Sequence, residues 1–182
     1  DRNLSRGLGD VYKRQGYMTY DLRNEIEVLN DDNIDFINMP NLYFFQPEIV
    51  WFVKGKIVTG LSFEKDLIDN DWKKFNEISK KEKTKNSSIV KLNLRNSKSE
   101  YINKVNKIKE RIFRGDCYEI NFCFDLFSEY DEINPYDTYF KLNNYTKSPM
   151  SSFLKANDLF LISSSPERFL SKNGEDIISQ PI

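Results

Sequence analysis

The 182-residue sequence contains no histidine, which removes the usual general base near neutral pH and the commonest metal ligand. Acid–base chemistry would therefore fall to carboxylates, lysine, tyrosine or cysteine. Positive charge is not in excess either, because 27 lysines and arginines face 28 acidic residues, for a formal net charge of −1. Without a basic stripe, the sequence gives no electrostatic indication of nucleic-acid binding.

Cysteine and long apolar runs are also scarce. The two cysteines, Cys117 and Cys123, are six residues apart in a predicted strand, about 20 Å at the rise of an extended chain. Such a pair cannot form a disulfide within one strand, so two free thiols favour a reducing, cytoplasmic setting. No stretch of about 18 apolar residues occurs, so we expect no membrane span. Glycine-rich phosphate loops and paired-cysteine zinc motifs are absent from the sequence as well.

Aromatic residues, in contrast, are abundant, at 14% of the chain within a hydrophobic fraction of 39%. Tyrosine and phenylalanine must therefore supply much of any core. The length suits one domain of ordinary size. Residues 1–15 have weak periodicity and a composition unlike the rest, which is typical of translated adapter sequence. We expect the native domain to cover residues 16–182.

Two helices are predicted in the second half of the chain. Ser99 is a plausible N-cap for a helix through Arg114, ended by Gly115 as the C′ residue. The dipeptide Asn134-Pro135 combines a cap with proline at the first helical position and predicts a helix to about Thr146. Between these helices, residues 117–127 alternate apolar and polar side chains with period two, which predicts a strand.

Hairpins account for much of the remaining sequence. A glycine or asparagine marks each predicted turn, where a positive φ is required. The pattern predicts paired strands over 42–53 and 56–63 around Lys54-Gly55, over 151–156 and 159–163 around Asn157-Asp158, and over 169–172 and 176–182 around Asn173-Gly174. A strand end over 16–21, a loop over 31–41, a helix over 71–83 and a strand over 89–94 complete the prediction. Helices mixed with hairpins favour an α+β fold with mainly antiparallel sheets.

Three segments carry residues suited to chemistry, and each has a purely structural interpretation beside it. In residues 163–167, proline fixes the backbone before Glu167, and three serines ending at Ser165 leave room for a polar ligand. The alternative is a solvated strand start. Residues 115–119 are either a site or simply a helix stop entering a strand. Residues 20–27 hold several carboxylates but also suit a capped helix start.

Taken in order, these segments resemble the chorismate-binding enzymes, a family that includes anthranilate synthase component I and aminodeoxychorismate synthase component I. The resemblance covers nearly all of 16–182 and rests on five motifs: 20–27 (YDLRNEIE), 115–121 (GDCYEIN), 148–154 (SPMSSFL), 165–169 (SPERF) and 180–182 (QPI). Within the family, Cys117-Tyr118 and Arg168-Phe169 are similar to the aminodeoxychorismate branch, although Glu119 replaces its usual glutamine.

The resemblance implies a four-layer α/β/β/α fold with two orthogonally packed antiparallel sheets, incomplete in this chain. It implies that chorismate is the substrate, that a glutamine amidotransferase subunit supplies ammonia, and that Mg²⁺ positions the substrate carboxylate. Glu167 corresponds to the family's general acid/base, which must hold a proton near neutral pH, as burial favours. Ser165 is a candidate substrate contact, and Pro149, Met150 and Ser151 lie where some members bind tryptophan.

The resemblance also implies that essential groups lie outside this sequence. The branch motif Pro-Ile-Lys-Gly-Thr would begin at Pro181, so its lysine nucleophile would follow Ile182, and the Mg²⁺ ligands would come later still. We therefore expect no metal ligands in this chain, a missing start and C-terminal half of the domain, and no activity by itself. Two alternatives stay open: an anthranilate synthase or other chorismate-utilising enzyme, and a non-catalytic binding or regulatory domain of the same fold.

Overall fold

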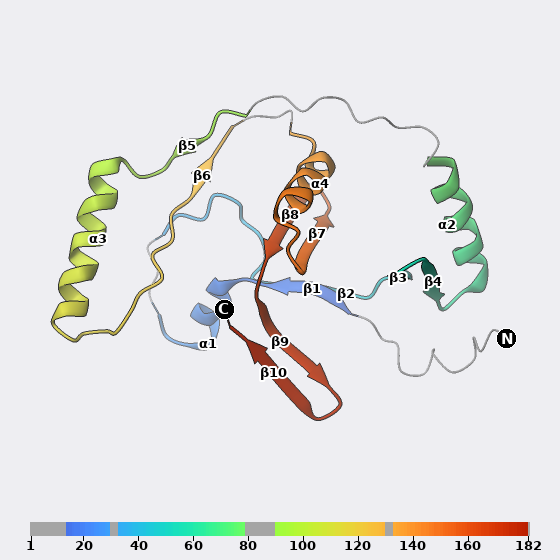
Figure 1. The fold of residues 1–182 in the computed structure, drawn as a ribbon, viewed down its shortest axis with the longest axis horizontal. Coiled ribbons are helices and arrows are strands. Elements are labelled where there is room, and N and C mark those ends of the chain that lie inside the picture. Colours follow the sequence, from blue (N-terminus) through green and yellow to red (C-terminus); the bar gives the residue numbers. More distant parts are fainter. Residues whose placement is uncertain (1–13, 30–32, 79–89, 130–132, 182) are drawn as a thin grey trace. The chain divides into compact units, whose positions relative to one another are not determined.

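A computed structural model of the chain describes residues 14–29, 33–78, 90–129 and 133–181 (Figure 1). The chain divides into two compact units, residues 1–83 and 84–182, and each is described by itself. Helices occur with antiparallel strand pairs in both units, which confirms the predicted α+β class. None of the helices in the described ranges has the length and apolar character that crossing a membrane requires.

The described residues of the first unit form two strand pairs. Strand β1 (Gln15–Met18) pairs with β2 (Leu42–Phe45), and a short 3-10 helix η1 (Tyr20–Leu22) leads into α1 (Arg23–Ile26). Strand β3 (Ile49–Lys54) pairs with β4 (Ile57–Ser62), with Gly55 at a φ of +61° in the turn. This confirms the hairpin predicted around Lys54-Gly55, whereas the apolar run predicted as one strand over 42–53 forms two.

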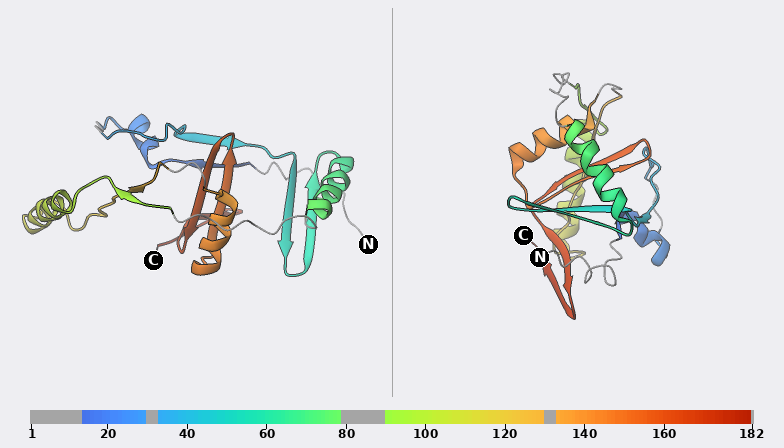
Figure 2. Two further views of the ribbon diagram at one scale, coloured as in Figure 1. Left: turned by 90° about the horizontal axis from the view of Figure 1, so that it is seen from above. Right: turned by 90° about the vertical axis from the view of Figure 1, so that its right-hand side faces the viewer.

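Helix α2 (Lys65–Ile78) packs against β4 (Figure 2). It begins six residues before the predicted start at 71, and the predicted end at 83 lies outside the described residues. Trp51 anchors the packing: its indole N–H donates to the Asp71 carboxylate at 2.7 Å, and its ring lies 5.4 Å from that of Trp72. Gly60 allows this approach, since a Cβ there would lie 2.7 Å from the Trp51 ring.

The second unit begins with β5 (Asn93–Leu94), α3 (Lys98–Phe113) and β6 (Leu126–Phe127), with β5 and β6 antiparallel. Ser97, and not the predicted Ser99, is the N-cap of α3. The reason is a capping box: the Ser97 Oγ accepts from the Glu100 backbone N–H at 3.3 Å, and the Glu100 carboxylate accepts from the Ser97 N–H at 2.7 Å. Gly115 follows the helix at a φ of +80°, as predicted for a C′ residue.

The strand predicted over 117–127 forms only at Leu126–Phe127, so the prediction is wrong for residues 117–125. A strand needs a ladder partner, and the described residues supply one only for β6. The strand predicted over 89–94 is likewise reduced to Asn93–Leu94, residue 89 being outside the described ranges.

The remaining elements match the predictions closely. Helix α4 (Pro135–Thr146) has Asn134 as its N-cap, which accepts from the Tyr136 and Asp137 N–H groups at 3.0 and 3.2 Å. Strands β7 (Met150–Ala156) and β8 (Leu159–Ser165) form one hairpin, and β9 (Arg168–Asn173) and β10 (Asp176–Gln180) form another. Gly174, at a φ of +61°, makes the second turn.

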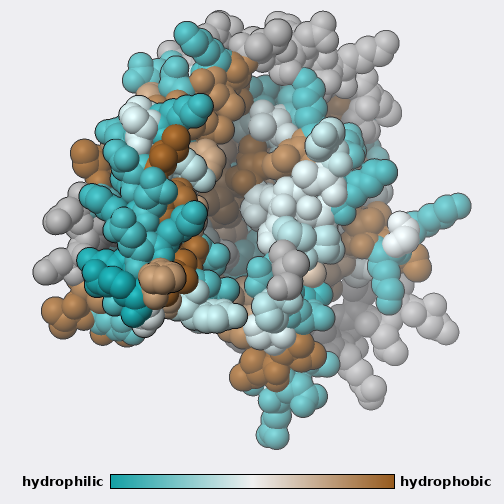
Figure 3. All heavy atoms as spheres, turned by 60° about the vertical axis from the view of Figure 1, so that its left-hand side comes forward, coloured by the Kyte–Doolittle hydropathy of each residue, from teal (hydrophilic) through white to brown (hydrophobic). Residues whose placement is uncertain are grey.

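Burial is slight throughout the described ranges. No large hydrophobic side chain there is buried, and Asp137, at 7% exposed, is the one buried polar residue. Figure 3 accordingly shows hydrophobic side chains reaching the surface between hydrophilic ones. Aromatic side chains instead cover one another in part, above all where α4 packs against β8.

Candidate functional site

Glu167 lies in the short connection between β8 and β9. The Ser165 hydroxyl binds the backbone on both sides of the Glu167 side chain: it accepts from the Glu167 N–H at 3.1 Å and donates to the Glu167 carbonyl at 3.2 Å. Ser165, through these two bonds, and Pro166, through its ring, both fix the backbone that carries the Glu167 carboxylate. Glu167 itself is exposed, as is Pro166.

The β9–β10 ladder places the end of β10 beside this connection. Arg168 is the ladder partner of Gln180, with an irregularity between Ile178 and Gln180. The antiparallel register therefore directs Pro181 past Gln180 toward the level of Glu167. Two motifs that are more than ten residues apart in sequence, at 165–169 and at 180–182, are thus brought together by the hairpin.

The β7–β8 ladder brings the tryptophan-site-like residues to the same serine run. Met150 pairs with Ser165 and Ser151 with Ser164, while the exposed Pro149 precedes the strand. Because neighbouring strand residues face opposite sides, Met150 and Ser165 share one face of the hairpin and Ser151 shares the other with Ser164. The described structure thus joins the predicted residues of the two motifs at one end of one hairpin.

A cluster of hydroxyl groups on the Ser164 face is not anticipated by the sequence motifs. The Thr146 hydroxyl, at the end of α4, hydrogen-bonds the Ser164 hydroxyl. Ser151 Oγ lies 3.4 Å from Ser164 Oγ and donates to the Ser148 carbonyl at 2.9 Å. This cluster ties the helix end to the hairpin. The sequence gives only a weak signal for this hydroxyl cluster, because the cluster depends on how α4 packs against the hairpin strands.

The carboxylates of residues 20–27 are engaged locally in the first unit. Asn41 donates to the Glu25 carboxylate at 2.6 Å, and the Thr19 hydroxyl donates to the Asn41 side-chain oxygen at 2.7 Å. The Arg23 guanidinium donates to the Tyr20 hydroxyl at 3.0 Å and lies 4.4 Å from its ring centre. The bonds of Asn41 hold the helix start against the residue that directly precedes β2, which favours the structural interpretation of this motif.

Residues 115–119 also have a structural explanation. The Asp116 carboxylate accepts from Arg111 at 3.2 Å and from Arg114 at 2.7 Å, so it closes the end of α3. Cys117 is half-buried and Cys123 exposed. Both are free thiols, as predicted, although the strand on which that prediction rested does not form at these residues.

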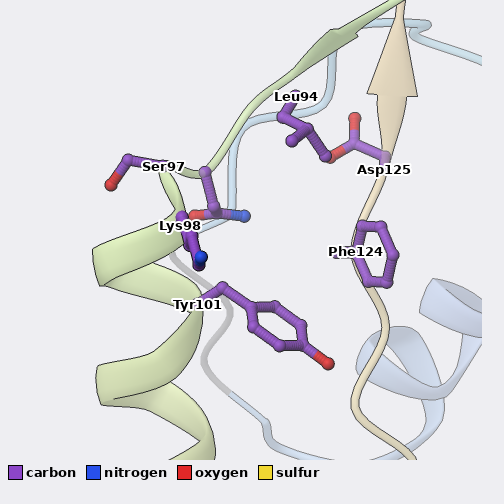
Figure 4. A pocket seen from close by; sticks show the side chains of 7 residues that line it. Leu94, Ser97, Lys98, Tyr101, Phe124 and Asp125 are labelled. Carbon is purple, nitrogen blue, oxygen red and sulfur yellow. The ribbon is translucent and has the colours of Figure 1, made fainter.

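A pocket of about 300 Å³ lies where the start of α3 faces the chain before β6 (Figure 4). Tyr101 and Phe124 form its aromatic part, with Leu94 opposite. Arg95 forms an ion pair with Asp125 at its edge, and the Arg95 guanidinium lies 4.5 Å from the Phe127 ring centre. Sequence reasoning missed this pocket, although Tyr101 in a helix and Phe124 in an alternating segment were visible.

Metal binding finds no support in the described residues. No group of three or more histidine, cysteine, aspartate or glutamate side chains is placed there to hold an ion. The described residues therefore do not fit Mg²⁺.

Comparison with known proteins now decides the family. The sequence profile of the chorismate binding enzymes matches residues 4–182, which is nearly the whole chain. This chain belongs to the chorismate binding enzyme family. The resemblance inferred from the five motifs is thereby confirmed at the level of the family.

Relatives from two branches match this family member at low identity. Aminodeoxychorismate synthase component 1 of Salmonella typhimurium is 24% identical over 169 residues, which are 92% of this chain and 37% of the relative. Anthranilate synthase component 1 of Lactococcus lactis is 25% identical over 181 residues, which are 92% of this chain and 39% of the relative. The chain thus spans well under half the length of these curated relatives.

A solved structure shows the same fold. Anthranilate synthase component I from Streptococcus pneumoniae TIGR4 superposes with a TM-score of 0.73 at 18% identity, over 88% of this chain and 40% of that one. This likeness confirms the predicted anthranilate synthase component I-like α+β fold. The predictions for residues 1–15, for Glu167 and Ser165 as site residues, and for tryptophan binding stay predictions.

Proposed function

We propose that this chain is part of an aminodeoxychorismate synthase component I, which converts chorismate and ammonia to 4-amino-4-deoxychorismate on the way to para-aminobenzoate and folate. The β9–β10 ladder carries the proposal, because it sets the Glu167 connection beside the strand end after which a lysine nucleophile is expected. Curated relatives named aminodeoxychorismate synthase component 1 support the branch. A cytoplasmic location, an ammonia-supplying glutamine amidotransferase subunit, and Mg²⁺ bound by groups other than the described residues belong to the same proposal.

Glu167 acts in this proposal as the acid that protonates the departing 4-hydroxyl of chorismate. The Ser165 hydroxyl positions the acid by its two bonds to the Glu167 backbone. Glu167 lies exposed in this chain, so the acid role requires further family residues that exclude water from the reacting atoms. We expect the chain by itself to be inactive.

The test compares two carboxylates in a full-length protein that contains this chain. Glu167→Ala should lower the turnover of chorismate with ammonia by about 10²–10⁴-fold, as expected for loss of a positioned acid. Glu175→Ala removes a carboxylate from the β9–β10 turn and should leave turnover unchanged. Equal effects of the two variants would contradict the proposal. The 182-residue chain alone should give no product, and measurable turnover would refute its expected inactivity.

Anthranilate synthase is the second candidate, favoured by the Lactococcus lactis relative and by the Streptococcus pneumoniae structure. Chromatographic separation of anthranilate from 4-amino-4-deoxychorismate distinguishes the two reactions directly. The residue encoded after Ile182 provides an independent test, since lysine supports the aminodeoxychorismate branch and alanine supports anthranilate synthase.

A further inference from the structure

Three hydroxyl groups meet where the end of α4 reaches the β7–β8 hairpin, and their protons have one consistent arrangement. The Thr146 hydroxyl donates to the Leu142 carbonyl at 2.9 Å. The Ser151 hydroxyl donates to the Ser148 carbonyl at 2.9 Å. Because a hydroxyl carries a single proton, both of these oxygens act only as acceptors toward Ser164. The Ser164 hydroxyl is therefore the donor, and the Thr146 oxygen, the nearer of the two, receives its proton.

This bond fastens the end of β8 to the end of α4. Thr146 is the last residue of α4, and the helix packs against β8 (Figure 1). Ser164 is the last residue but one of β8. Helix ends fray easily, so a bond at this place limits the movement of both chain segments.

The next residue continues the connection toward Glu167. Ser165 points to the opposite face of the hairpin from Ser164, and its hydroxyl binds the Glu167 backbone at both the N–H and the carbonyl. Two adjacent serines thus hold the end of β8 from both faces, one to the helix and the other to the turn that carries the carboxylate. Since Glu167 is exposed, the position of its carboxylate depends on this backbone.

We propose that Ser164 is a positioning residue for the Glu167 acid: its bond to Thr146 fixes the direction in which β8 ends, and the following turn carries that direction to the carboxylate. The inference rests on the proposed function, in which Glu167 protonates the departing hydroxyl. An acid must lie within hydrogen-bond reach of the atom that it protonates, and a displacement of about 1 Å can lower a rate by about 10²-fold. Release of the β8 end should therefore slow the reaction without weakening substrate binding.

Variants of matched shape, in a full-length protein that contains this chain, test the Ser164 donor. Ser164→Val removes the hydroxyl, whereas Ser164→Thr has the same shape and keeps it. Valine and threonine both suit a strand, so β propensity does not separate the two variants. We expect Ser164→Val to lower kcat about tenfold at an unchanged KM, and Ser164→Thr to keep most of the wild-type kcat. Equal kcat values for the two variants, or a change confined to KM, would overturn the proposal.

Thr146→Val tests the same bond from the helix, and α4 supplies a matched control. The Thr138 hydroxyl donates to the Asn134 carbonyl at 2.9 Å, just as Thr146 donates one turn back in the helix. Thr138→Val therefore reports the loss of such a local bond without the contact to Ser164, and it should leave kcat unchanged. Thr146→Val should lower kcat as Ser164→Val does, and the double variant should lose no more than either alone, because all three remove one bond. Independent, multiplying losses would contradict the inference.

A Glu167→Ala background shows whether the bond acts through the acid. There, Ser164→Val should cause no further loss of kcat, because the group that it positions is gone. An equal loss in both backgrounds would refute the inference and leave the proposed function intact. If Glu167→Ala by itself leaves turnover unchanged, the proposed function fails and the inference fails with it.

Discussion

Helix α4 and helix α3 both lie beside sequence with strong strand character, yet only α4 has a completed partner. Helix α4 packs against β8, and four aromatic rings gather there, each with its centre within about 6 Å of at least one other: Tyr136, Tyr139, Phe153 and Phe160. Helix α3 contacts segment 117–125 through Tyr101, but the segment has no ladder in the described residues.

The difference lies in where each strand finds its partner. Strands β7 and β8 are joined by a two-residue turn at Asn157-Asp158, so closing their ladder costs little chain entropy. Segment 117–125 follows a helix and leads into β6, whose own partner β5 is only two residues long. Strand propensity alone therefore does not make a strand, because the ladder requires a second chain segment at the right place.

The largest expected effect comes from a matched pair of phenylalanines. Phe153 is half-buried, and its ring centre lies 5.1 Å from that of Tyr136. Phe153→Ala should therefore lower the free energy of unfolding of the α4–hairpin region by about 2 kcal/mol. Phe124 is 53% exposed, and Phe124→Ala should cost about 0.5–1 kcal/mol. Hydrogen-exchange protection measures both regions separately. A larger loss for Phe124→Ala would mean that Phe124 packs more tightly in solution than Phe153 does.

The helix caps should be equivalent in the two regions, because capping is local. Asn134→Ala removes the acceptor for the Tyr136 and Asp137 N–H groups, and Ser97→Ala removes the acceptor for the Glu100 N–H. Each change should destabilise its own helix by about 1 kcal/mol. Exchange rates of first-turn amides in α3 and α4 provide the measurement. If Ser97→Ala had no effect while Asn134→Ala did, the α3 capping box would not exist in solution.

The same division between local and distant causes explains what could be predicted from sequence. The bounds of α4 and the three hairpin turns depend on neighbouring residues, and all were predicted. The sequence pattern predicts Ser99 as the N-cap of α3, whereas the structure has Ser97 there. Glu100, three residues after Ser97, is the capping-box signal in the sequence. The failed strand over 117–125 depends on a distant partner, which a local pattern does not reveal.

The candidate site follows the same rule. The position of Glu167 between two strands follows from the strands predicted over 159–163 and 169–172. The turn at Gly174 alone would set Arg168 opposite Pro181, and the irregularity between Ile178 and Gln180 moves the pairing to Gln180, which a local pattern does not reveal. The contact between Thr146 and Ser164 was not predicted, because it depends on the packing of α4 against β8.

The smallest expected effect is a pH dependence that separates the two caps. The hydrogen bond from the Ser97 side chain, followed by that from the Ser97 backbone, lowers the pKa of the Glu100 carboxyl from its ordinary value of 4.5. A group whose pKa is lowered by folding stabilises the folded state above its ordinary pKa, and that contribution disappears as the pH falls through the lower value. The α3 capping box should therefore weaken below pH 4.5, whereas Asn134 caps α4 with a side chain that does not titrate.

Glu100→Gln separates this titration from general acid effects. Glutamine keeps a neutral acceptor at the N3 position of the capping box, so the cap of α3 should be slightly weaker at neutral pH. Because glutamine does not titrate, this cap should not weaken further when the pH falls through the range in which carboxyl groups take up protons. NMR signals of the Ser97 and Glu100 amides, followed from neutral pH downward, report the cap directly. If these signals moved identically in the wild type and in Glu100→Gln, the pH response would come from other carboxylates, and the difference between the two helix starts would have to lie in geometry alone.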